Sequence, residues 1–243
     1  CAPGTRTTIL QRVQDWIKFT QTDRLLWIHG RPGSGKTTLS ATILDILMKL
    51  EMPVSAQFFI SRAIDDTRGS CKLFPTLADQ LIRFSSPAVV RALAGELAKR
   101  RAVPLLVRDQ VEPLLLVPLR MLAKVTSTVI IFIDAIDELR DESTIEEVCD
   151  ALVYLGSRLP DNVRVIVTSR PERKIIEKLQ KNCFEMSLNT NQSKAEVGNF
   201  IATRLKVLSE TTGWGPAWPP AGTAKELSTA ADGLFHWAAT ALS

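Results

Sequence analysis

Residues 29–38 read HGRPGSGKTT. Within this stretch, the template G-x-x-x-x-G-K-[ST] of a phosphate-binding loop is filled by Gly30, Gly35, Lys36 and Thr37. A loop that wraps a polyphosphate points successive backbone N–H groups inward, which requires small residues and positive φ angles. The lysine supplies a charge for the β- and γ-phosphates, and the threonine hydroxyl can bind Mg²⁺. The predicted nucleotide contacts are Gly30, Arg31, Pro32, Gly33, Ser34, Gly35, Lys36, Thr37 and Thr38.

The residues on either side of this phosphate loop (residues 30–37) supply the context that the motif requires. The segment 24–29, RLLWIH, has the apolar composition of a buried strand. After the loop, apolar residues recur at helical spacing, among them Leu39, Ile43 and Leu47. The alternative interpretation is a glycine-rich turn that binds nothing, and it does not require this context. We therefore predict a nucleotide-binding protein.

An acidic cluster follows a second apolar run. The segment 129–133, VIIFI, predicts a fully buried strand, and Asp134 follows it directly. A carboxylate in this place holds Mg²⁺ in P-loop enzymes, so we expect Asp134 on the metal together with Thr37. Small Ala135 would leave room beside the phosphates, and Asp137 and Glu138 are candidates to orient the attacking water. The alternative is a strand that ends in an ordinary acidic loop.

An arginine ends the next predicted strand. Residues 163–169, VRVIVTS, have strand composition, and Arg170 follows them. An arginine there could reach the γ-phosphate and stabilise the transferring charge. The alternative is a surface arginine in the turn before Pro171.

The order of the predicted elements indicates an α/β fold. Strands expected at 24–29, 54–60, 129–133, 163–169 and 183–188 alternate with helices, which predicts a parallel sheet covered on both faces. Thr7 or Thr8 is expected to cap the first helix. Further helices are expected at 87–101 and 105–124, where Pro104, Pro113 and Pro118 either break the segment or occupy first-turn positions. After about residue 190 the alternation stops, and a small helical unit is expected.

Composition sets limits on partners and compartment. The 243 residues carry a net charge of +4, and the densest basic run, 99–101, is short and lacks interleaved aromatic residues. We therefore expect no nucleic-acid partner. Four cysteines without metal-binding spacing indicate a reducing compartment, and no signal peptide or membrane-spanning run is visible, so a cytoplasmic location is expected. A chain that begins with Cys is expected to be a fragment.

Several stretches together resemble a fungal NACHT domain, a member of the STAND class of signal-transduction ATPases that is related to NOD-like receptors. The most specific of them is D-[small]-x-D-E, met by Asp134, Ala135, Asp137 and Glu138. The resemblance covers nearly all of the chain. The stretches that carry it are CAPGTR, GRPGSGKTT, FFISR, FPTLADQL, VIIFIDAIDEL, VIVTSRPE and ADGLFHWAATAL.

The resemblance implies a three-layer αβα P-loop domain over residues 1–190, with a lead helix in 1–22. Its five-stranded sheet would be of the additional-strand kind, in which the Walker B strand is not adjacent to the Walker A strand. Residues 191–243 would form a helical lid, and the family's winged-helix segment is missing. Arg170 would be the sensor, with the Pro3–Arg6 lead, including Arg6, and the Gly233–Phe235 turn near adenine or ribose.

The resemblance also implies a function as a nucleotide-dependent switch. ATP or ADP with Mg²⁺ would be the ligand, with GTP as an alternative, although the sequence lacks the N-K-x-D signature of guanine recognition. ADP would hold a closed monomer, and ATP would open it for self-association. Effector and sensor or repeat domains would lie outside this chain. Two other functions fit the same motifs: an AAA-type motor acting on nucleic acid or protein, and a P-loop kinase.

Overall fold

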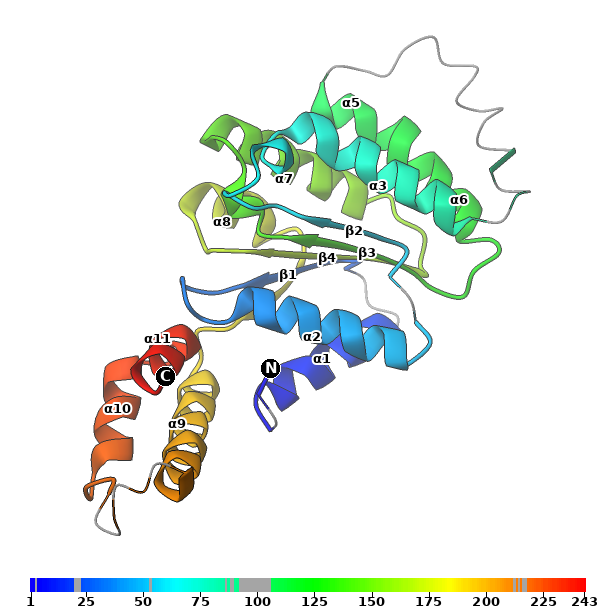
Figure 1. Cartoon of the computed structure of the whole chain (residues 1–243). Coiled ribbons are helices and arrows are strands. Elements are labelled where there is room, and N and C mark those ends of the chain that lie inside the picture. The colour runs from blue at the N-terminus through cyan, green and yellow to red at the C-terminus, as the bar shows by residue number, and fades with distance from the viewer. Residues whose placement is uncertain are drawn as a thin grey trace.

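Five parallel strands form one sheet at the centre of the molecule (Figure 1). The computed structural model describes residues 1–2, 4–19, 23–52, 54–85, 87, 90–91, 106–211, 213, 215 and 218–243. The strands are β1 (Leu25–His29), β2 (Ala56–Phe59), β3 (Val129–Asp134), β4 (Val163–Ser169) and β5 (Phe184–Ser187).

The strand order in the sheet is β2-β3-β4-β1-β5. β4 therefore lies between β3, which ends in the acidic cluster, and β1, which leads into the phosphate loop. This is the additional-strand arrangement that the resemblance implied, and the prediction of an α/β fold with a five-stranded parallel sheet is confirmed. Every residue of β1, β3 and β4 is buried, as expected for strands covered on both faces.

Helices cover the two faces of the sheet separately. One face carries α3 (Ser70–Phe84), α5 (Val107–Val111), α6 (Val117–Leu122), α7 (Glu142–Gly156) and α8 (Arg173–Leu179), and the other carries α1 (Thr7–Lys18) and α2 (Lys36–Lys49) (Figure 1). Alternate residues of a strand point to opposite faces. Accordingly Leu25 and Trp27 belong to the first apolar cluster, and Leu26 and Ile28 belong to the second.

One sequence-based expectation about the helices is corrected by the structure. Neither Thr7 nor Thr8 caps α1: the residue before the helix is Arg6, whose backbone is left-handed (φ 61°) and whose side chain makes no capping bond. Both threonines already lie inside the helix, so their hydroxyls cannot accept from its first free N–H groups in the way an N-cap residue does.

Of the two alternatives for the prolines of the segment 105–124, the structure bears out the second for Pro113 and Pro118: each lies in the first turn of a helical element, and neither breaks the segment. Between α5 and α6 the chain forms a π-helical turn, η2 (Glu112–Leu116), and the helical course continues. A wider turn relieves the clash between a proline ring and the carbonyl group four residues earlier. Residues 92–105, which include Pro104 and the basic run 99–101, lie outside the described residues, as does most of the helix expected over 87–101.

The predicted C-terminal helical unit consists of α9 (Asn191–Thr211), α10 (Thr223–Ala231) and α11 (Phe235–Ala241). It has its own small apolar cluster, which is separate from the two clusters on the sheet. The unit lies beside the end of the sheet at which the phosphate loop leads into α2 (Figure 1). None of the helices in the described part of the chain is long and apolar enough to cross a membrane.

The core on the α1–α2 face depends on one large side chain of β3. Phe132 in β3 is fully buried, and it belongs to the same cluster as Leu39, Ile43 and Leu47 of α2. Phe132→Ala should lower the free energy of unfolding by about 3–5 kcal/mol, because truncation leaves a cavity. Urea denaturation measures this. The control Phe19→Ala, at a residue that is 61% exposed, should change stability by less than about 0.5 kcal/mol. An equal effect of the two substitutions would contradict the assignment of Phe132 to the core.

Candidate nucleotide site

The phosphate loop requires glycine at the positions where the template has it. Gly35 is the residue before α2 and has a left-handed backbone (φ 85°). A side chain at Gly30 would place its Cβ 2.6 Å from Ser34 Oγ and 2.9 Å from Leu188 Cβ, so the loop could not keep its path. The loop opens directly into α2, whose first N–H groups favour an anion.

Lys36 lies across the loop. Its Nζ donates to the carbonyl groups of Gly30 (2.6 Å) and Arg31 (3.2 Å). Burial lowers the pKa of Lys36, and the nearby Asp137 carboxylate opposes this shift. The ammonium group is therefore partly desolvated, which strengthens its attraction for a phosphate.

Asp134 is buried, and two hydroxyl groups orient it. Its Oδ1 accepts from Ser40 Oγ of α2 (2.6 Å) and from Thr168 Oγ1 of β4 (2.6 Å). The Thr168 hydroxyl in turn accepts from the backbone N–H of Ala135 (3.0 Å). Ser40 was not among the predicted site residues, although its position four residues after Lys36 places both on one face of α2.

Ala135 has a left-handed backbone, with φ 62° and ψ 51°. This conformation costs a residue other than glycine about 1 kcal/mol. The turn lets the chain leave β3 and enter the short 3₁₀ helix η3 (Ile136–Glu138), which contains both acidic candidates. The small residue in D-[small]-x-D-E thus occupies a strained position of the backbone.

The two acidic candidates differ in their surroundings. The Asp137 side chain is 2% exposed, and its Oδ2 lies 3.1 Å from Arg170 Nε. Its Oδ1 accepts from the backbone N–H of Arg170 (2.9 Å). Glu138 is half-buried, and its Oε2 accepts from the backbone N–H of Arg62, three residues after β2 (2.9 Å). Asp137 therefore holds Arg170, and Glu138 is the more accessible carboxylate.

One cavity of about 520 Å³ brings the predicted residues together, a size within the range of small-molecule sites. The helical unit contributes Phe200, Phe235, His236 and Ala239 to its walls. The predicted residues in the lining are Arg6, Pro32, Gly33, Gly35, Lys36, Thr37, Thr38, Asp134, Asp137, Glu138 and Arg170. Three other predicted contacts, Gly30, Arg31 and Ser34, are described but do not belong to the lining.

The side chains that line the cavity suit a metal ion that is also bound by the phosphates of a nucleotide. Among the described residues, no group of three or more His, Cys, Asp or Glu side chains is arranged to hold a metal ion. Mg²⁺ is commonly bound by one or two carboxylates together with substrate phosphates and water. Thr37 and Asp134 line the same cavity, and an oxygen from each suits this mode of binding.

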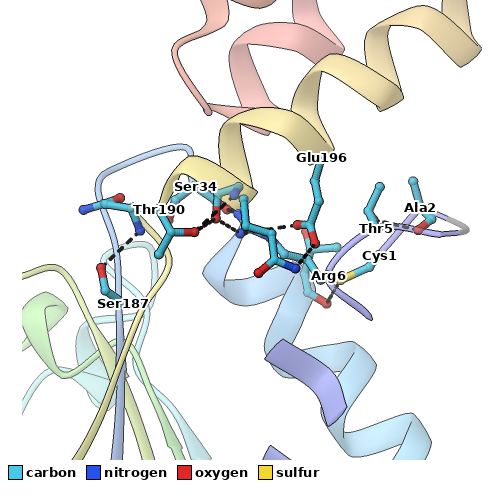
Figure 2. Close-up of polar contacts among 12 residues, drawn as sticks. Cys1, Ala2, Thr5, Arg6, Ser34, Ser187, Thr190 and Glu196 are labelled. Carbon is cyan, nitrogen blue, oxygen red and sulfur yellow. Dashed lines mark hydrogen bonds and ion pairs between the residues drawn. The ribbon is translucent and has the colours of Figure 1, made fainter. Parts of the chain in front are cut away.

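Arg6 is buried among protein groups, although it also borders the cavity (Figure 2). Its Nη2 donates to the Ser34 carbonyl (2.7 Å), and its Nη1 donates to Ser193 Oγ of α9. Glu196 Oε2 lies 3.8 Å from Nη1. The predicted contact of Arg6 with adenine or ribose stays a prediction, and the structure adds these protein partners.

Comparison with solved structures gives matches of low similarity. Domain III of the replication initiation protein DnaA from Thermotoga maritima matches with 13% identity and a TM-score of 0.46, over 100% of this chain and 83% of that one. The ORC1 protein of Aeropyrum pernix in complex with DNA matches with 15% identity and a TM-score of 0.49, over 96% of this chain and 57% of that one. Cdc6p from Pyrobaculum aerophilum matches with 14% identity and a TM-score of 0.46, over 84% and 50%. The chain thus spans about half of the length of the last two. No curated protein sequence matches the chain.

A family model described as Nephrocystin 3, N-terminal, matches residues 4–170. The match begins in the lead before α1, includes the phosphate loop and β1 to β4, and ends at Arg170. It therefore covers more than half of the chain and contains every residue proposed above for phosphate, metal and water. The chain belongs to the Nephrocystin 3, N-terminal family.

Proposed function

We propose that this chain is a nucleotide-dependent switch that binds ATP or ADP with Mg²⁺ and hydrolyses ATP slowly, as in NACHT domains of the STAND class. One observation carries the proposal: the cavity is walled by the phosphate loop, the acidic end of β3, Arg170 and the helical unit together. A nucleotide bound there would contact both the P-loop domain and the helical unit, so its chemical state could bias how the two are arranged.

The surroundings of the side chains suggest a division of roles. Thr37 and Asp134 would share Mg²⁺, and Lys36 would contact the β- and γ-phosphates. Glu138 would orient the attacking water, since Asp137 is already paired with Arg170. Arg170, one-third exposed and held by Asp137, would sense the γ-phosphate.

The switch would act through parts that move. Residues 191–243 would serve as the lid of the P-loop domain (residues 1–190), with ADP favouring a closed monomer and ATP an open form that self-associates. Such a switch requires a different affinity for nucleotide in the two forms, by about 1–3 kcal/mol. Effector and sensor domains outside this chain would receive the signal.

The nucleotide that the protein carries tests this proposal. The purified chain should be denatured and the released nucleotide identified by chromatography. Bound ADP, together with slow hydrolysis that DNA, RNA and unfolded protein leave unchanged, is expected. Hydrolysis stimulated by any of these polymers would instead favour a motor, and labelled phosphate on a small metabolite would favour a kinase. Bound GDP would assign guanine as the base.

Lys36→Ala should weaken nucleotide binding by at least about 100-fold, close to 2.7 kcal/mol, because the phosphates lose their ammonium partner. Isothermal calorimetry with MgADP measures the affinity. The control is Lys49→Ala at the other end of α2, where the exposed ammonium pairs with Asp45 on the surface. Unchanged affinity in the Lys36 variant would show that the loop does not bind phosphate.

Glu138→Gln should keep ATP affinity within about twofold and slow hydrolysis by about 10²–10⁴-fold, because the water loses its base. Release of phosphate from labelled ATP in a single-turnover assay measures the step. Glu147→Gln on the exposed side of α7 is the matched control. If phosphate release by the Glu138 variant is undiminished, another group orients the water.

Arg170→Ala should lower affinity for a non-hydrolysable ATP analogue by about 10-fold and leave ADP affinity within about twofold, because only the γ-phosphate loses a charged partner. Competition against a fluorescent ADP derivative measures both. An equal loss for the two nucleotides would exclude a sensing role.

A further inference from the structure

The phosphate loop is also bound to other elements through three of the four positions that the motif leaves free, residues 31–34. Arg31 Nη2 donates to the Asp232 carbonyl (2.7 Å) and to its carboxylate (3.0 Å), at the end of α10. The Gly33 carbonyl accepts from the backbone N–H of His236 in α11 (3.1 Å). The Ser34 carbonyl accepts from Arg6. The residues fixed by the motif are the ones expected to bind phosphate, whereas Arg31 and Gly33 contact the helical unit and Ser34 contacts the lead of the chain.

Arg6 is the residue among these contacts that joins three elements at a buried point (Figure 2). Its side chain is 4% exposed. It precedes α1, donates to Ser34 of the loop, and donates to Ser193 of α9. Its guanidinium also lies over the Phe235 ring of α11, 4.9 Å from the ring centroid. A single guanidinium thus contacts the loop and two helices of the helical unit.

The partners of Arg6 are themselves held in place. Thr190 Oγ1 accepts from the backbone N–H of Ser193 (3.1 Å), the pattern of a helix N-cap, so the first turn of α9 is fixed. On the other side, α1 is anchored through Trp16 and Ile17, which are buried in the sheet cluster. The Arg6 guanidinium therefore connects elements, α9 and α1, that are each fixed by contacts of their own.

Separating the loop from the helical unit would be costly at this point. A buried charge is tolerated when hydrogen bonds satisfy it, and an unsatisfied one is strongly unfavourable. If the Ser34 carbonyl moved away, Arg6 would lose a partner in a place that water reaches poorly. Burial already lowers the pKa of Arg6, while the Glu196 carboxylate favours its charged form.

We propose that Arg6 is a positioning residue that couples the phosphate loop to the helical unit, so that a change in the loop on nucleotide binding moves α9. This role rests on the proposed function as a switch. It differs from a direct contact with adenine or ribose, because it acts through Ser34 and Ser193.

A double-mutant cycle separates the two roles. MgADP affinity should be measured by calorimetry for the wild type, Arg6→Gln, Ser193→Ala and the double variant. Ser193 is described and is not among the residues that line the cavity. We expect each single variant to lose about 5- to 10-fold in affinity, and the double variant to be no weaker than Arg6→Gln alone. Wild-type affinity for Ser193→Ala, or effects that add, would overturn the proposal. The control is Gln192→Ala, on the exposed side of the same helix turn.

A distance measurement tests the coupling without nucleotide. Spin labels would be attached to Cys71, exposed on α3, and to an introduced cysteine at exposed Lys225 of α10, in a Cys1→Ser background. Burial raises the pKa of the Cys149 and Cys183 thiols to about 12, so these two should not react with the label.

Pulsed electron paramagnetic resonance should give one narrow distribution of distances between the two labels. Arg6→Gln should broaden it, Arg6→Lys should restore part of its sharpness, and the exposed control Arg12→Gln should leave it unchanged. An unchanged distribution in Arg6→Gln would overturn the proposal. If the labelled protein with Arg6 intact binds no nucleotide, the switch function fails, whereas this distance readout still tests the link between the two units.

Discussion

Three buried charges around the site, those of Asp134, Asp137 and Arg6, find their hydrogen-bond partners in distant parts of the chain. Asp134 at the end of β3 takes its donors from α2 and β4. Asp137 takes both of its contacts from Arg170, at the end of β4. Arg6 joins the lead of the chain to the phosphate loop and α9. Since an unpaired buried charge is costly, these contacts determine which elements can lie next to each other.

Much of the sheet could be predicted because its strands carry a strong local signal. The run 129–133 is apolar throughout, the run 163–169 is rich in valine and isoleucine, and both form strands buried on two faces. Those runs did not show the order of the strands, and the resemblance of the motifs implied only that β3 and β1 are not adjacent, as the structure has them. The phosphate loop was likewise visible because its glycines and lysine stand at fixed spacing in one short stretch.

The rest depends on contacts between residues far apart in the sequence. Asp137 was a candidate to orient water, and its pairing with Arg170, 33 residues later, could not be seen in the sequence. Thr7 and Thr8 were candidates to cap α1, but the chain enters that helix through the left-handed backbone of Arg6. Local propensity could not reveal this, because the Arg6 side chain is fixed by Ser193, 187 residues away. The wide turn at Pro113 is similar, since its apolar residues pack into the sheet core.

The strained alanine after β3 has a consequence for how the acidic loop can vary. The left-handed conformation of Ala135 excludes β-branched residues and penalises every other side chain, so the requirement for a small residue comes from the backbone as well as from room for a ligand. Glycine would remove the strain but would also free the peptide unit between Asp134 and Asp137. Ala135 therefore costs about 1 kcal/mol of stability and fixes the backbone between Asp134 and the Asp137 carboxylate that holds Arg170. The acidic loop thus contains one strained residue, and its backbone conformation sets the course of the chain between Asp134 and Asp137.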